Sequence, residues 1–220
     1  MNAARPRIAL IHALAHSVAP INDALARDWP EAQRMNLLDD SLSADLARSG
    51  RLDDVMTARF VALGDYAARC GADAIAFTCS AFGPCIAAVK RRLAPLPVLE
   101  PYEAMIDAAA AQARAHGGRI GLVASFAPTL ASMPAQFPAD VPLVGALADG
   151  ALQALDRGDG AAHDRAAVRA ALALQAQGCS AIALAQFSLA RARAPVAAAT
   201  GLPVFTTPDT TVQALRRRLG

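Results

Sequence analysis

The stretch GADAIAFTCSAFGPC, from Gly71 to Cys85, decides the fold. Its apolar run is bounded by turn residues, which predicts a short strand over Ala74–Thr78 that is covered on both faces. Gly83 and Pro84 then suit the first turn of a helix. We therefore expect Cys79 at the end of a strand and beside the amide-rich end of a helix, where a thiolate is stabilised and anions bind.

The chain contains a second copy of this stretch. GCSAIALAQFSLA, which begins at Gly178, overlies the first copy and places Gln186 at the position of Cys79. Two further pairs of segments repeat in the same order at nearly the same offset: RIALIHALA with RIGLVASFA, and LPVLEP with LPVFTT. Three repeats in one order predict a duplicated unit, and thus two similar lobes related by a pseudo-twofold axis.

The alternation of apolar strands with amphipathic helices predicts an α/β fold with a short, mostly parallel sheet in each lobe, flanked by helices. We expect lobe one to comprise residues 1–99 and 208–220 and to carry Cys79. Lobe two should comprise residues 100–207 and carry Gln186. Ligands of such sheets bind outside the carboxyl ends of the strands, so the active site is expected in the cleft between the lobes.

Composition excludes several classes of partner. The chain has 21 basic and 19 acidic residues and a net charge of +2, which is too balanced to predict binding to nucleic acid or to a charged membrane surface. It contains no apolar run of the roughly 18 residues that a membrane span needs. Its four cysteines lack the spacing of a metal site. We expect a cytoplasmic protein with free thiols and no metal.

The predicted strand ends carry polar and aromatic side chains that could bind a substrate. The candidates are His12, Ser17, Ser80, Ser125, Phe126, Gln186, Phe187, Ser188 and Thr206. The hydroxyls would hold a carboxylate, and the two phenylalanines would exclude water. Ser125 and Ser188 could instead cap helices. His12 or His16 could lie beside Cys79 as a thiolate–imidazolium pair, which would supply a second acid or support hydrolysis.

With these motifs the duplicated chain resembles the aspartate/glutamate racemase superfamily. That superfamily includes aspartate, glutamate and hydantoin racemases, maleate isomerase and arylmalonate decarboxylase. The resemblance implies that each lobe supplies one cysteine and that the pair works on opposite faces of a substrate carbon. It also implies a small carboxylate-bearing substrate, no metal or other cofactor, and a homodimer or larger homo-oligomer.

The chain departs from this pattern at one of the two cysteine positions, which is filled by Gln186. An amide has no proton to exchange in the useful pH range, so two-cysteine racemisation is not expected. Cys179 lies at the far end of the same strand, roughly 20 Å away at about 3.3 Å per residue. We expect racemase-, isomerase- or decarboxylase-type chemistry with Cys79 as the single acid/base or nucleophile. The alternatives are a non-catalytic binder of small anions and a Cys–His hydrolase.

Overall fold

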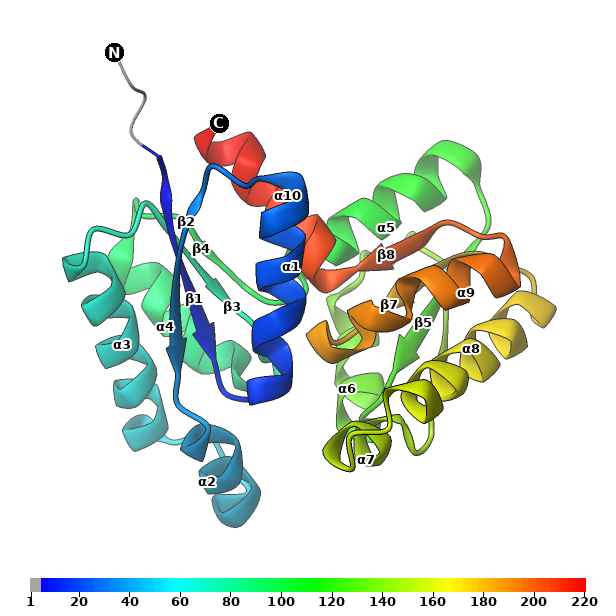
Figure 1. Cartoon of the computed structure of the whole chain (residues 1–220), viewed down its shortest axis with the longest axis horizontal. Coiled ribbons are helices and arrows are strands. Elements are labelled where there is room, and N and C mark those ends of the chain that lie inside the picture. Colours follow the sequence, from blue (N-terminus) through cyan, green and yellow to red (C-terminus); the bar gives the residue numbers. More distant parts are fainter. Residues whose placement is uncertain (1–4) are drawn as a thin grey trace. The chain divides into compact units, whose positions relative to one another are not determined.

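The structure, a computed structural model, describes residues 5–220. It divides the chain into two compact units (Figure 1). Unit 1 holds the described residues up to Pro101 together with Thr211–Gly220, and unit 2 is Tyr102–Thr210. Each unit contains a four-stranded sheet in which every pair of neighbouring strands is parallel. The predicted α/β class with two parallel sheets is thereby confirmed.

The sheet of unit 1 has the strand order β2-β1-β3-β4. Its strands are β1 (Arg7–His12), β2 (Gln33–Leu38), β3 (Ala74–Phe77) and β4 (Val98–Leu99). The helices and turns of this part of the chain are η1 (Ala15–Ser17), α1 (Val18–Asp28), α2 (Ser41–Ser49), α3 (Asp54–Arg69), η2 (Ser80–Phe82) and α4 (Gly83–Leu93).

Helices cover both faces of this sheet. Ile11, Ile75 and Phe77 point to the face where α3 and α4 pack, and they share a core with Phe60 and Val89 from those helices. The other face is covered by α1 and by the last helix, α10 (Thr207–Leu219), as Figure 1 shows. The boundary between the units falls within α10. A strand buried on both faces has no polar surface to present except at its ends, which is where the candidate site residues lie.

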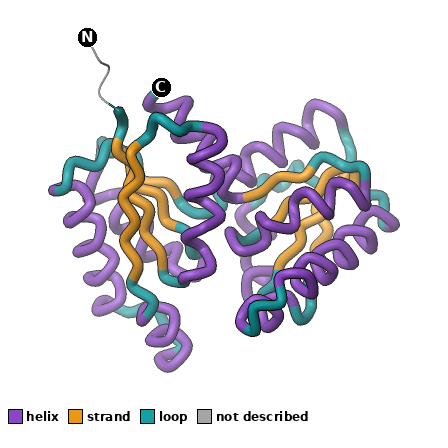
Figure 2. The backbone as a smooth tube through the Cα atoms, viewed as in Figure 1, coloured by secondary structure: helices purple, strands orange, loops and turns teal. Residues whose placement is uncertain are grey.

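The sheet of unit 2 has the order β6-β5-β7-β8, which repeats the order of unit 1. Its strands are β5 (Arg119–Ala124), β6 (Leu143–Leu147), β7 (Cys179–Leu184) and β8 (Val204–Thr206). Its helices and turns are α5 (Glu103–His116), α6 (Ala127–Ser132), η3 (Met133–Gln136), α7 (Ala151–Asp156), α8 (Gly160–Ala176), η4 (Phe187–Ala192) and α9 (Arg193–Thr200). The helix α5 packs on one face of this sheet, and α8 and α9 pack on the other (Figure 2).

The two units also agree in local conformation. Gly71 follows α3 with φ of 76°, and Gly178 follows α8 with φ of 81°, a backbone geometry that favours glycine. A buried strand comes next in each unit. Cys79 and Gln186 then adopt extended backbone, and each immediately precedes a short 3-10 turn. The turn η2 stands between Cys79 and α4, so the expected direct step from strand to helix contains one extra turn. Within residues 5–220, no helix combines the length and apolar character that crossing a membrane requires.

Candidate active site

Cys79 lies at the carboxyl end of β3, the second residue beyond the strand. Its side chain is partly buried and lines a crevice of unit 1, called here the Cys79 crevice. The other residues of the crevice are Ile11, His12, Ala13, Leu42, Phe60 and Phe77. The space they enclose is too small to admit a water molecule. The sulfur atom therefore has mostly hydrocarbon around it.

These surroundings govern the ionisation of the thiol. Burial raises the pKa of Cys79 above its ordinary value, while hydrogen bonds with the Ala81 backbone amide and the Ser43 side chain oppose the shift without outweighing it. The amide at the start of the turn is thus present as expected. The expectation of a stabilised thiolate is nevertheless wrong, because loss of water disfavours the charged form more than these hydrogen bonds favour it.

His12 ends β1 and is completely buried. Its Nδ1 lies 2.9 Å from Thr78 Oγ1, and its Nε2 lies 3.0 Å from Asn36 Oδ1. The side-chain amides of Asn22 and Asn36 hydrogen-bond each other. Because Asn36 Oδ1 only accepts, His12 carries its proton on Nε2 and accepts the Thr78 proton at Nδ1. Burial lowers the pKa of His12 although the Asn36 hydrogen bond opposes it, so the ring is neutral at pH 7.

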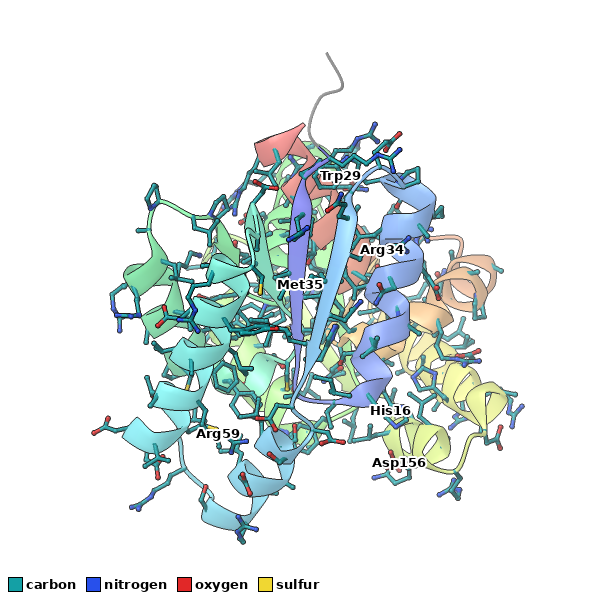
Figure 3. The ribbon with its side chains drawn as sticks, turned by 60° about the vertical axis from the view of Figure 1, so that its left-hand side comes forward. His16, Trp29, Arg34, Met35, Arg59 and Asp156 are labelled. Carbon is teal, nitrogen blue, oxygen red and sulfur yellow. The ribbon has the colours of Figure 1, made fainter. Side chains whose placement is uncertain are left out.

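The pairing of His12 with Cys79 that a Cys–His hydrolase needs is therefore not found. Both ring nitrogens of His12 have other partners, Thr78 and Asn36. His16 is exposed in η1 and is labelled in Figure 3. Ser17 is buried at the start of α1 but does not cap that helix with its side chain. Ser80 is partly buried in the first position of η2.

Gln186 holds the equivalent position in unit 2, the second residue beyond β7. Its Oε1 accepts a hydrogen bond from the Ser125 backbone amide at 3.0 Å. Since a backbone amide can only donate, this contact fixes the orientation of the carboxamide. Gln186 Nε2 is buried, and within residues 5–220 it has no hydrogen-bond partner. The carboxamide therefore presents an unused donor at a strand end.

Thr206, one of the expected substrate contacts, caps a helix in the structure. It is completely buried, and its Oγ1 accepts a hydrogen bond from the Asp209 amide at 3.2 Å, which caps the first turn of α10. The next residue, Thr207, is also completely buried, and its hydroxyl has no partner among the residues that the structure describes. Leu184 pairs with Thr206 on neighbouring strands, so Gln186 and Thr207 follow the ends of adjacent strands.

The remaining candidates of unit 2 differ in exposure. Phe126 is 47% exposed just after β5, whereas Phe187 is only 2% exposed. Phe187 is thus an interior side chain of its unit, and its expected contact with a substrate finds no support. Ser188 is partly buried within η4.

The other cysteines occupy different places in the fold. Cys85 is buried in α4, with its sulfur 3.5 Å from Thr57 Oγ1. Cys179 begins β7 and so lies at the opposite end of that strand from Gln186. Cys70 ends α3. Across residues 5–220, no three His, Cys, Asp or Glu side chains are grouped so that they could hold a metal ion.

Ser43 was not among the expected site residues, and Thr207 was expected at a strand end but not as a substrate contact. Ser43 lies in α2, where the sequence DDSLSADLARSG predicts only a polar loop or a short helix. Ser43 and Cys79 are far apart in the chain, so the sequence around either residue does not predict their contact. Thr207 stands beside Thr206, and which of the two hydroxyls caps α10 depends on the residue at which that helix begins.

Comparison with known proteins supplies the family. The Asp/Glu/Hydantoin racemase family model matches residues 15–215. A glutamate racemase, isoform RacE1 from Bacillus anthracis, has a similar structure with a TM-score of 0.72 and 12% identity, covering 97% of this chain and 81% of its own. The allantoin racemase from Klebsiella pneumoniae has a TM-score of 0.71 and 18% identity, covering 96% of this chain and 86% of its own.

Unliganded arylmalonate decarboxylase is a third similar structure. Its TM-score is 0.62 at 19% identity, and the match covers 98% of this chain and 94% of that one. At such identities the likeness shows the fold alone. No curated protein matches the chain by sequence.

Proposed function

Because the chain belongs to the Asp/Glu/hydantoin racemase family, we propose that it is a cofactor-independent enzyme acting at the carbon next to a carboxylate, with Cys79 as its single acting thiol. The position of Cys79 carries this proposal. It is the cysteine that directly follows the buried central strand β3, where parallel sheets place their ligands. The similar proteins named above are two racemases and a decarboxylase, so isomerase- or lyase-type chemistry at one carbon is the reaction class proposed.

Cys79 suits the role of a proton donor. Burial raises the pKa of its thiol, so the sulfur carries a proton at neutral pH. In the proposed step a substrate carbon loses carbon dioxide, or gives its proton to the thiolate form of Cys79, and the electron pair of the broken bond remains in an enediolate. The Cys79 thiol then gives its proton to that carbon. The resulting thiolate regains a proton from solvent, which closes the cycle without an oxidant or a reductant.

Donors at the strand ends of unit 2 suit a negatively charged group. Gln186 Nε2 and the Thr207 hydroxyl are both buried, and neither has a partner within residues 5–220. Unpaired buried donors are costly in the free protein and gain most when an anion accepts from them. We propose that they hold the substrate carboxylate or the enediolate. The loss of one such donor typically costs about 2.7–4 kcal/mol of transition-state stabilisation.

The proposal is tested by following the α-carbon in D2O. A panel of small acids, containing amino acids, dicarboxylic acids and malonates with one apolar substituent, is incubated with the native protein and observed by proton NMR. Deuterium at the α-carbon, with or without release of carbon dioxide, supports the enzyme. Tight binding of an acid from the panel without exchange or decarboxylation contradicts it.

That second outcome would favour a non-catalytic binder of small anions on the same scaffold. One observation favours this alternative: the position equivalent to Cys79 carries Gln186, which can donate hydrogen bonds but cannot exchange protons. The two functions make opposite predictions for substrate analogues that mimic the enediolate. An enzyme binds such planar analogues 10²-fold or more tightly than the parent acid, on the order expected for transition-state analogues. A binder shows no such preference.

The remaining expectations belong to the same proposal. We propose a small carboxylate-bearing substrate, a cytoplasmic location and a homodimer or larger homo-oligomer. Light scattering of the purified protein tests the last of these, because a monomer at micromolar concentration would contradict it.

A further inference from the structure

The helix α2 reaches the Cys79 crevice through two neighbouring side chains. Leu42 is completely buried and forms part of the crevice wall. The next residue, Ser43, donates a hydrogen bond from Oγ to the Ala13 carbonyl at 2.9 Å and also hydrogen-bonds Cys79. A helix that follows an edge strand thus supplies both an apolar and a polar contact at the sulfur.

Arg59 of α3 connects α2 to the body of unit 1. Its Nη1 lies 2.5 Å from Asp45 Oδ2, and its Nη2 lies 2.7 Å from Asp39 Oδ2 and 2.6 Å from Ser41 Oγ. The Asp39 amide donates in turn to the His12 carbonyl at 3.1 Å. Figure 3 labels Arg59 beside α2. The guanidinium therefore ties both the start and the middle of α2 to α3.

From this geometry we propose that Ser43 is a positioning residue of Cys79 and that Arg59, through Asp39 and Asp45, keeps Ser43 in place. The inference rests on the proposed role of Cys79 as the acting thiol. The Ser43 hydroxyl has one proton and two acceptors within reach. While Cys79 is a thiol, S–H donates to Ser43 Oγ, and the hydroxyl donates to Ala13. Once the thiol has given up its proton, the hydroxyl turns and donates to the thiolate.

Few other polar groups act on this sulfur. His12 is the other titratable side chain of the crevice, and its ring nitrogens face Thr78 and Asn36. The guanidinium of Arg59 forms ion pairs with the carboxylates of Asp39 and Asp45. The Ser43 hydroxyl and the Ala81 amide are the hydrogen-bonding groups that favour the thiolate. Removal of the hydroxyl should therefore change the titration of Cys79 visibly.

The first experiment measures alkylation of Cys79 by iodoacetamide as a function of pH in the full chain, with the Cys79 peptide quantified by mass spectrometry. We expect Ser43→Ala to raise the thiol pKa by about one unit, which slows alkylation at neutral pH about tenfold. The rate at high pH, where the thiol is fully ionised, should stay unchanged. Ser43→Thr keeps a hydroxyl and should titrate like the native protein. If Ser43→Ala titrates like the native protein, Ser43 has no such role.

The second experiment tests Arg59. We expect Arg59→Gln to increase the high-pH alkylation rate about tenfold, because α2 no longer shields the sulfur, and to make a further Ser43→Ala change without effect. Arg48→Gln is the matched control, since Arg48 also pairs with Asp45, at 2.6 Å, but lies on α2 itself. It should behave like the native protein. Equal rates in Arg59→Gln and Arg48→Gln would overturn the role of Arg59.

These measurements need no substrate. A native protein that fails to turn over any acid refutes the proposed function but leaves the Cys79 titration readable. Conversely, an active enzyme whose Cys79 titration ignores Ser43 refutes only the positioning role. Circular dichroism melts of each variant show that the compared proteins are folded.

Discussion

Gln186 Oε1 accepts a hydrogen bond from the Ser125 backbone amide, with 3.0 Å between the two atoms. The contact joins the loop after β7 to the loop after β5 within unit 2. It also turns Gln186 Nε2 away from Ser125, where it has no partner within residues 5–220. The carboxamide oxygen of Gln186 thus accepts from the backbone, while the carboxamide nitrogen remains an unused donor.

The hydrogen bond from the Ser125 amide predicts that Gln186→Ala lowers the stability of the fold. The Ser125 amide would lose its acceptor, so we expect the free energy of unfolding in urea to fall by about 1–3 kcal/mol. Ser188→Ala is the control, because Ser188 is also partly buried and lies on the same turn. It should stay within about 0.5 kcal/mol of the native protein. Equal stability of the two variants would show that the Gln186–Ser125 bond contributes nothing.

We also predict that the substitution Gln186→Cys gives the protein a new activity. The sequence leads us to expect that the racemases carry a second cysteine at this position, and a thiol can exchange a proton where the amide cannot. We expect the variant to racemise a chiral acid that the native protein binds, measured by chiral chromatography. Gln186→Ser, which lacks an exchangeable group of suitable pKa, is the control. Identical behaviour of the two variants would contradict this prediction.

We predict that the Thr207 hydroxyl contributes to substrate binding but does not stabilise the free protein. Its buried hydroxyl has no partner in the described part of the chain, so Thr207→Val removes an uncompensated polar group and should leave the free energy of unfolding unchanged or increased. Substrate binding should weaken about tenfold, which corresponds to about 1.4 kcal/mol.

Thr206→Val is the matched control because it removes the hydroxyl that accepts from Asp209. We expect it to destabilise the fold by about 1 kcal/mol through loss of the helix cap. The two variants are compared by urea unfolding and by titration calorimetry with a bound acid. Native affinity in Thr207→Val would remove Thr207 from the site.

His12 is predicted to make stability fall in mild acid. Its pKa in the folded state is lowered by burial, against the opposing Asn36 hydrogen bond, and lies below the ordinary 6.5. Below pH 6.5 the unfolded chain therefore binds more protons than the folded one, and stability decreases as the pH falls. A difference of one bound proton sets the upper limit of this slope at about 1.4 kcal/mol per pH unit. His12→Gln should flatten this part of the stability profile, measured by urea unfolding at several pH values. A native slope in His12→Gln would contradict the assignment.

Much of the fold follows from local sequence. Apolar runs such as Ala74–Phe77, the glycines that precede them and the repeated order of segments predict two parallel sheets, because burial of a central strand leaves a continuous apolar stretch. The same reasoning places Cys79 and Gln186 at strand ends. The strands and glycines can be predicted because each depends only on neighbouring residues, and the repeat is found by comparing two stretches of the same chain.

The chemistry at those ends depends on distant residues. The pKa of Cys79 is set by side chains such as Leu42 and Phe60, which come from α2 and α3. The sequence shows only that His12 ends a strand, whereas the structure shows that its two ring nitrogens hydrogen-bond Asn36 and Thr78. A sequence pattern reports neither the neighbours of a sulfur atom nor the partners of a ring, so these parts of the site required the structure.

The sharpest test of the proposed function compares Cys79→Ser with Cys70→Ser in α-carbon exchange or decarboxylation of one acid in D2O. Both substitutions remove a partly buried thiol, but Cys70 ends α3 and has no place in the proposed chemistry. We predict that Cys70→Ser keeps the native rate and that Cys79→Ser loses at least about 10²-fold, the range typical of a general acid. An unchanged rate in Cys79→Ser would contradict the proposal that this thiol performs the reaction.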